Sequence, residues 1–150
     1  MKKLFLLSTM LAFMPLCRAN ENQAGDGIDA THYEIHLNEI NFDNRTIEAT
    51  TVVTLTATNP ASSFELELKT LTVHEIVSSD IGVSGFSQSG DILEISLSSA
   101  MTAGESYSFT IRYGGDTFHE DWGGIHWSAD YVYNLGVGFD SQPHNLGKTW

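Results

Sequence analysis

Two groups of histidine and carboxylate side chains in this sequence have the chemistry of metal ligands. The first is the pair His32 and His36, with Glu34 between them. On a helix, two histidines at this spacing can bind zinc, as in the pattern His-Glu-x-x-His. Here the glutamate comes one place too late, and the segment alternates like a strand. On a strand the two residues stand roughly 13 Å apart at ~3.3 Å per residue. We therefore predict solvent-facing histidines that share no metal.

The second group lies in a glycine- and tryptophan-rich region, 117–127, and in the terminal segment that follows. It contains His119, Glu120, Asp121, His126 and His144. Imidazoles and carboxylates together can ligate zinc, but these spacings match no compact metal motif. A Gly-x-Ser-x-Gly sequence is also absent, so a serine hydrolase of that type has no support. We predict no metal site and no catalytic residue in this chain.

Ligand-binding chemistry is better represented between Gly123 and Trp150. The paired glycines Gly123 and Gly124 permit close backbone approach. Aromatic side chains supply a large apolar contact area, and amide or carboxylate groups can hydrogen-bond a ligand such as a substrate ammonium group. These residues are Trp122, Trp127, Tyr131, Tyr133, Phe139 and Trp150, with Asp140, Gln142 and Asn145. Two interpretations stay open: a binding loop, or ordinary core aromatics.

The elements that must position these residues are β-strands almost everywhere. Apolar and polar residues alternate in short runs separated by turn residues, and no window after residue 19 has helical periodicity. Seven short strands with a turn every 8–12 residues are typical of an antiparallel β-sandwich. The fold class is therefore predicted as all-β. The strands are expected at 32–38, 46–58, 64–68, 71–77, 82–90, 91–97 and 107–113.

Each predicted strand has one apolar face. Tyr33, Ile35 and Leu37 share a face of the first. In the second strand, every second residue lies on the same face; these are Ile47, Ala49, Thr51, Val53, Leu55 and Ala57. In the sixth strand, the residues expected to point inward are Leu93, Ile95 and Leu97. Asp43-Asn44-Arg45 is predicted as a turn, and Gly114-Gly115 is predicted to end the last strand.

The first nineteen residues have the pattern of a secretory signal peptide. Lys2 and Lys3 precede a short apolar run, and Cys17-Arg18-Ala19 offers small residues before a cut. An acylated Cys17 is the less favoured alternative. We expect a signal peptide at 1–19, a flexible leader at 20–30 and one β-sandwich domain at 31–150. The protein is therefore expected to be exported, either periplasmic or secreted, with no membrane span after signal removal.

The charge of the remaining chain is strongly negative. Removal of residues 1–19 takes three of the 7 basic residues and none of the 19 acidic ones, which leaves a formal charge of −15. Nucleic-acid binding requires Lys and Arg to neutralise phosphate, so that class of partner is excluded. An anionic membrane surface is excluded for the same reason. The only cysteine, Cys17, leaves with the signal, so the domain has no disulfide.

Several of these segments, taken in order, resemble a known family. They are Tyr33-Glu34-Ile35-His36-Leu37, the long strand from Thr46, Phe64-Glu65-Leu66-Glu67-Leu68, Gly104-Glu105 with Ile111-Arg112-Tyr113-Gly114-Gly115, and Tyr133-Asn134 through Gln142-Pro143-His144-Asn145 to Lys148-Thr149-Trp150. From about Thr31 to the end, the chain is similar to the N-terminal β domain of the zinc aminopeptidases of the aminopeptidase N and leukotriene A4 hydrolase type.

This resemblance implies a saddle-shaped β-sandwich that caps a catalytic domain and removes no amino acids by itself. It implies that Gln142, which precedes Pro143, helps to bind the free α-amino group of a peptide substrate. The family's zinc ligands, in His-Glu-x-x-His and a later Glu, have no counterpart in these 150 residues. Zinc is thus expected in a catalytic domain that is missing here, and the chain is expected to be the incomplete front piece of an exported metallo-aminopeptidase, inactive alone. The alternative is a free-standing secreted β-sandwich that binds a glycan or a protein.

Overall fold

Antiparallel β-strands make up most of the described chain. The computed structural model describes residues 24–120 and 123–137, with the side chains of 135–137 left undescribed. Its strands are β1 (Ile28–Asn41), β2 (Thr46–Ala57), β3 (Ala61–Glu67), β4 (Thr72–Val77), β5 (Val83–Ser89), β6 (Ile92–Met101), β7 (Ser106–Asp116), β8 (His119–Glu120), β9 (Gly123–Trp127) and β10 (Val132–Val137). The described residues form no helix, and so none that could span a membrane. The all-β prediction is confirmed.

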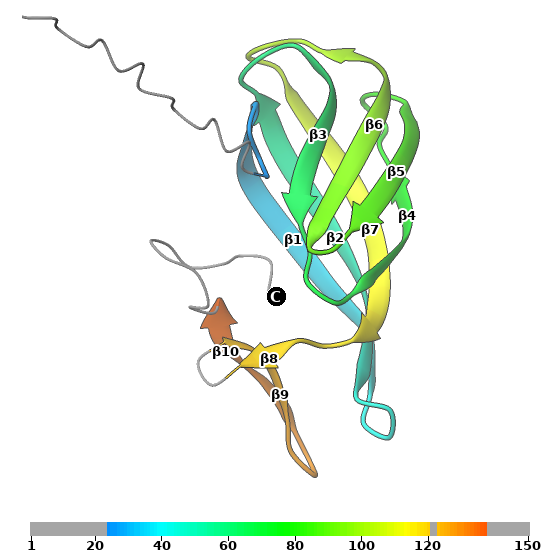
Figure 1. The fold of residues 1–150 in the computed structure, drawn as a ribbon, viewed down its shortest axis with the longest axis vertical. Coiled ribbons are helices and arrows are strands. Elements are labelled where there is room, and N and C mark those ends of the chain that lie inside the picture. The colour runs from blue at the N-terminus through cyan, green and yellow to red at the C-terminus, as the bar shows by residue number, and fades with distance from the viewer. Residues whose placement is uncertain (1–23, 121–122, 138–150) are drawn as a thin grey trace, which may run out of the picture.

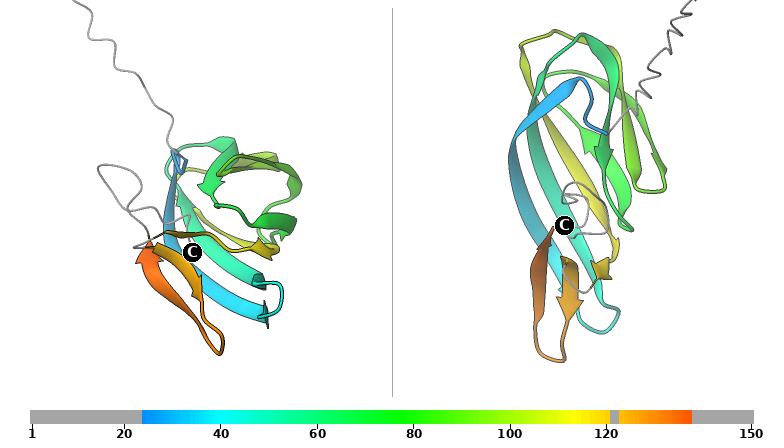
Figure 2. Two further views of the ribbon diagram at one scale, coloured as in Figure 1. Left: turned by 60° about the horizontal axis from the view of Figure 1, so that its bottom comes forward. Right: turned by 60° about the vertical axis from the view of Figure 1, so that its left-hand side comes forward.

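The strands form two facing sheets and a third, smaller one. The first sheet has the order β1-β2-β7-β4 and the second the order β3-β6-β5. These two face each other as a sandwich, and the third sheet, β10-β9-β8, lies beside the β1–β2 turn at one end of it (Figures 1 and 2). Strands distant in sequence lie side by side, because β7 inserts between β2 and β4.

The core consists of the alternating apolar residues of the facing sheets. Every second residue of β2, from Ile47 to Ala57, is buried, as the sequence predicts. Across the sandwich Leu93, Ile95 and Leu97 of β6 are buried too, again as predicted. The ring of Phe109 on β7 is fully buried and lies with its centroid 4.9 Å from that of Phe64 on β3. This contact ties the two sheets together at the centre of the core.

The apolar face of β1 is the exception. Tyr33, Ile35 and Leu37 do share one face, as predicted, and they pair with Val53, Thr51 and Ala49, which are all buried. Their own side chains are nevertheless 52%, 47% and 53% exposed. Among the described residues, the second sheet has one strand fewer than the first, and none of its strands lies over β1 (Figure 1).

Two predicted boundaries are wrong. The first strand begins at Ile28, inside the segment 20–30 expected as a leader, because Ile28 pairs with Ala57 and the next two residues also pair with β2. The strand expected to stop at Gly114-Gly115 continues to Asp116, because both glycines pair with β2 opposite Glu48 and Ile47. The Glu48 carboxylate lies across Gly114, where a Cβ would overlap it. Here glycine makes room within a strand and does not end it.

Candidate functional site

The predicted substrate-binding residue, Gln142, lies outside the described residues. So do Asp121, Trp122, Phe139, Asp140, His144, Asn145 and Trp150 among the other candidates. What the structure shows of the candidate site is the sheet that leads to this segment, β8–β9–β10. Strand β10 ends at Val137, five residues before Gln142.

This third sheet corrects the sequence interpretation, which expected no strand after 107–113. The alternation rule misses it because the strands are short and rich in glycine. Gly124 has φ +76, and the Ile125 amide donates to the Phe118 carbonyl at 2.8 Å. The turn between β9 and β10 is closed by Ser128, whose amide donates to the Tyr131 carbonyl at 2.8 Å. Positive φ at the glycine lets β9 pass close to β8.

Four aromatic rings follow one another across this sheet. The centroids of His119 and His126 are 5.5 Å apart, and those of His126 and Tyr133 are 5.4 Å apart in a stacked arrangement. Tyr131 continues the series at 5.8 Å from Tyr133. Both tyrosines are exposed. Such spacings are typical of favourable ring contacts, so the third sheet presents a continuous strip of aromatic rings.

Trp127 has a structural role instead. Its ring meets Phe42 edge-on with centroids 5.5 Å apart, and its Nε1 donates to Thr117 Oγ1 at 2.7 Å. The Phe42 contact attaches the third sheet to the β1–β2 turn, and the Thr117 hydrogen bond attaches it to the link between β7 and β8. Of the two interpretations of the aromatic residues, packing applies to Trp127, whereas Tyr131 and Tyr133 face solvent and remain candidates for binding.

The histidines do not form a metal centre in the part of the chain that the structure describes. Within 24–120 and 123–137, no three His, Cys, Asp or Glu side chains gather closely enough to hold an ion. His32 and His36 are exposed on β1, as predicted, and His36 Nε2 lies 2.9 Å from Glu34 Oε1. The described residues thus do not fit a zinc ion.

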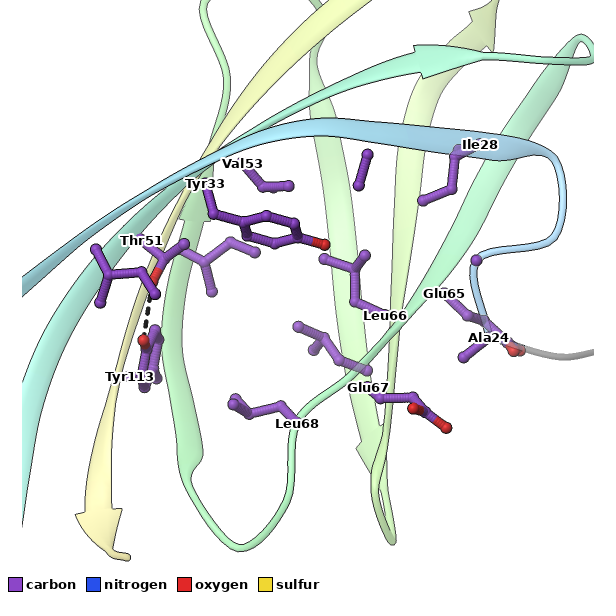
Figure 3. A pocket seen from close by; sticks show the side chains of 15 residues that line it. Ala24, Ile28, Tyr33, Thr51, Val53, Glu65, Leu66, Glu67, Leu68 and Tyr113 are labelled. Carbon is purple, nitrogen blue, oxygen red and sulfur yellow. Dashed lines mark hydrogen bonds between the residues drawn. The ribbon is translucent and has the colours of Figure 1, made fainter. Parts of the chain in front are cut away.

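A groove between β1 and β3 is a site that the sequence analysis missed. It has a volume of about 510 Å³, and its walls are mostly apolar. Tyr33 projects from β1 across the opening toward Leu66, and Leu68 also lines the groove (Figure 3). Partial burial raises the pKa of the Tyr33 hydroxyl above its ordinary value. No motif marks this groove, because it arises from the unequal widths of the two sheets.

One buried polar pair lies at the base of the groove. The hydroxyls of Thr51 and Tyr113 are 2.8 Å apart and form a hydrogen bond (Figure 3). Burial raises the pKa of Tyr113 above its ordinary value, and the hydrogen bond with Thr51 partly opposes this shift. The pair satisfies two polar groups that would otherwise be buried among apolar ones.

Replacement of Tyr113 by Phe should lower the free energy of unfolding by about 1–3 kcal/mol, because it leaves the Thr51 hydroxyl buried without its partner. The double variant Thr51→Val with Tyr113→Phe should be more stable than Tyr113→Phe alone. Because its pKa is raised in the folded state, the Tyr113 hydroxyl loses its proton at a lower pH in the unfolded state than in the folded state. Its contribution to the free energy of unfolding is therefore intact below pH ~10 and falls above it. In the Tyr113→Phe variant, the decrease in unfolding free energy at alkaline pH should be smaller. Urea unfolding at neutral and alkaline pH measures all three effects, and additive single-variant losses would contradict the pairing.

Solved structures of M1 zinc metallopeptidases share this fold. A mutant from Deinococcus radiodurans bound to a Tyr-Ser-Ala substrate is 22% identical, with a TM-score of 0.65, and the match covers 82% of this chain and 28% of that chain. A two-domain M1 zinc metallopeptidase mutant bound to L-tryptophan gives 23% identity, a TM-score of 0.65, and coverage of 81% and 28%. Another structure of the D. radiodurans enzyme is 22% identical, with a TM-score of 0.56, and the match covers 63% of this chain and 22% of that chain.

No protein-family model matches the sequence, and no curated protein matches it. The chain spans less than a third of the length of the metallopeptidase chains that it matches. At this identity the likeness concerns the fold, which is the level at which the sequence resemblance is confirmed. The chain has the fold of the N-terminal domain of the M1 zinc metallopeptidases.

Proposed function

We propose that this chain is the N-terminal, non-catalytic domain of an exported zinc metallo-aminopeptidase that removes N-terminal amino acids from peptides. The observation that carries the proposal is the shared fold over about four-fifths of the chain, against 28% of the neighbours' length. The signal-like residues 1–19 support export.

In this proposal the chain contributes to the recognition of substrate. The Gln142 side chain offers an amide oxygen that can accept a hydrogen bond from the substrate's α-ammonium group. The third sheet would position that residue, because β10 leads into its segment and the contacts of Trp127 attach the sheet to the sandwich. Zinc, which activates water for attack on the scissile carbonyl in such enzymes, would be held by residues other than those described here.

The first test is the size of the native polypeptide in its source cells, by immunoblot with an antibody raised against residues 31–113. We expect a polypeptide several times longer than 150 residues that releases amino acids from aminoacyl reporters, and we expect the isolated chain to release none. Chelator-sensitive turnover by the purified chain would contradict the non-catalytic assignment. A native polypeptide no longer than this chain would favour the free-standing binding module, with exposed Tyr131 and Tyr133 as its surface.

The second test is substitution of Gln142 in that native polypeptide. Gln142→Ala should lower kcat/KM about 10- to 100-fold on substrates with a free N-terminus, since a hydrogen bond to a charged group contributes about 1.5–3 kcal/mol. Gln142→Glu should retain activity, because a carboxylate also pairs with ammonium. Asn38→Ala, at an exposed amide on β1, is the matched control and should change nothing. Equal activity of Gln142→Ala and the parent would remove the residue from the site.

A further inference from the structure

Thr70 has a backbone conformation that threonine rarely adopts. Among the described residues it is one of two non-glycine residues with positive φ, which is 64° here. A β-branched residue in this region is an outlier. Such a conformation persists only where the surrounding contacts fix it, often at a position where precise geometry has a function. Thr70 lies in the crossover 68–71, which connects β3 of the second sheet to β4 of the first.

This crossover is attached to the second sheet. The side-chain amide of Gln88 on β5 donates to the Leu71 carbonyl at 2.6 Å, and its oxygen accepts the Val73 amide at 3.2 Å. At the other end, the Leu68 amide donates at 2.9 Å to the carbonyl of Asp91, in the turn between β5 and β6. The crossover is therefore fixed at both of its ends.

The Thr70 side chain contacts the end of β7. Its hydroxyl lies within donating distance of the Asp116 carbonyl, at 3.0 Å, and of the carbonyl of its neighbour Lys69, at 2.7 Å. Thr72 pairs with Gly114, so Thr70 occupies the place opposite Asp116. In a regular strand this side chain would stand perpendicular to the sheet and could not reach that carbonyl. The positive φ is thus what lets the hydroxyl act as the donor.

The crossover also contacts the link between β7 and β8 on the far side of Thr117. Lys69 Nζ stands 3.8 Å from the centroid of the Phe118 ring, a cation–π contact. Thr117 therefore lies between two residues that the crossover contacts, Asp116 and Phe118. Its Oγ1 accepts the Trp127 indole at 2.7 Å. The place of Thr117, and with it the attachment of the third sheet, depends on the crossover.

We propose that Thr70 is a positioning residue: its hydroxyl fixes the end of β7, so that Thr117 meets Trp127 and the third sheet keeps one orientation on the sandwich. The strained backbone is retained because it aims this hydroxyl. The effect on the third sheet is independent of the peptidase assignment. Any effect on activity rests on the function proposed above, because β10 leads from this sheet to Gln142.

Hydrogen exchange at the Trp127 indole, followed by NMR of the purified protein, tests this role. Thr70→Val keeps the shape of the side chain and removes the donor, so the indole should exchange about two- to tenfold faster. Thr70→Ser keeps the donor and should exchange at the parental rate. Thr72→Val, at an exposed threonine two residues further on, is the matched control and should change nothing. Backbone amides of β2 and β6 should keep their rates in all three variants.

A double-mutant cycle tests the second contact of the crossover. Lys69→Met and Phe118→Leu each remove one partner, and each should accelerate exchange at the Trp127 indole. The double variant should exchange no faster than the faster single variant, because the two residues act through one contact. The cycle separates this contact from any other interaction of Lys69. Accelerations that multiply in the double variant would contradict a joint role.

Activity gives a readout that stability alone does not move. In the aminopeptidase proposed above, Thr70→Val should raise KM about two- to tenfold for peptides with a free N-terminus, with a smaller change in kcat, because the amine contact is made in the ground and transition states alike. Thr70→Ser should restore the parental KM. If the native polypeptide has no aminopeptidase activity, the proposed function fails, and the exchange rates alone decide the role of Thr70.

Three results would overturn the proposal: a parental indole exchange rate in folded Thr70→Val, an equal acceleration in Thr72→Val, or an acceleration in Thr70→Val that extends by the same factor to the amides of β2 and β6. The last would mean that Thr70 contributes only to general stability. Thermal unfolding checks that each variant is folded. Thr70→Gly, which adopts a positive φ without strain, takes the place of Thr70→Val if that variant does not fold.

Discussion

Phe109→Ala should lower the free energy of unfolding by about 3–5 kcal/mol, the usual range for a buried Phe reduced to Ala. Phe109 is fully buried on β7, the strand between β2 and β4, and its ring contacts Phe64 on the opposite sheet. Truncation removes the contact that joins the sheets and leaves a cavity that a close-packed interior fills only in part. Because domains are stable by about 5–15 kcal/mol in total, the loss is a large fraction of the whole.

Urea unfolding followed by circular dichroism measures this loss as a lower midpoint with an unchanged slope. Phe86→Ala is the matched control: Phe86 lies on the edge strand β5 and is 39% exposed, so its truncation should have a much smaller effect. Equal losses at the two positions would mean that the Phe64–Phe109 contact is not central to the core.

Gly124→Val should disrupt the third sheet while leaving the sandwich folded. Gly124 has φ +76, and a Cβ there would overlap the Phe118 carbonyl oxygen and stand 2.9 Å from the His119 Cα. Both obstacles are backbone atoms, which cannot move aside as a flexible side chain does. The same carbonyl accepts the Ile125 amide. A β-branched residue is strained at this φ, at a cost on the order of 1–3 kcal/mol.

Hydrogen exchange at the Ile125 amide should accelerate strongly in Gly124→Val, whereas exchange in β2 and β7 should not change. Gly85→Ala in β5 is the control, because no atom lies within 4 Å of a Cβ at that position. In the aminopeptidase proposed above, Gly124→Val should also reduce activity, since β10 leads to Gln142. A protected Ile125 amide in the variant would show that the sheet tolerates a side chain there.

The parts of the fold that could be predicted are the strands with one solvent-exposed face and one buried face. In β2 and β7 that contrast repeats every second residue, so the period alone identifies the buried positions. The same pattern in β1 identifies which side chains share a face, but whether a second sheet lies over that face depends on the number of strands in it. That number is not encoded near Tyr33 or Ile35, and their exposure could not be foreseen.

The candidate site was harder to predict for a local reason. The short strands around Gly123 and Gly124 depend on a positive φ at Gly124, on the hydrogen bond to Phe118 just before β8, and on the contact with Phe42, which comes from a distant part of the chain. Glycine, which usually marks a turn, here permits pairing. Gln142 was identified only through the family resemblance, because a single amide before a proline has no chemical signature of its own.

The insertion of β7 between β2 and β4 has a consequence for the order of events during synthesis. Strand β2 ends at Ala57, and its second neighbour begins at Ser106. A ribosome adds about 5–20 residues per second. For several seconds after its own synthesis, β2 therefore has only β1 as a possible neighbour, because β7 has not yet been made. Pairings this distant in sequence also form slowly once the chain is free. The sandwich therefore closes when one of its last strands is made, long after its first hairpin is complete.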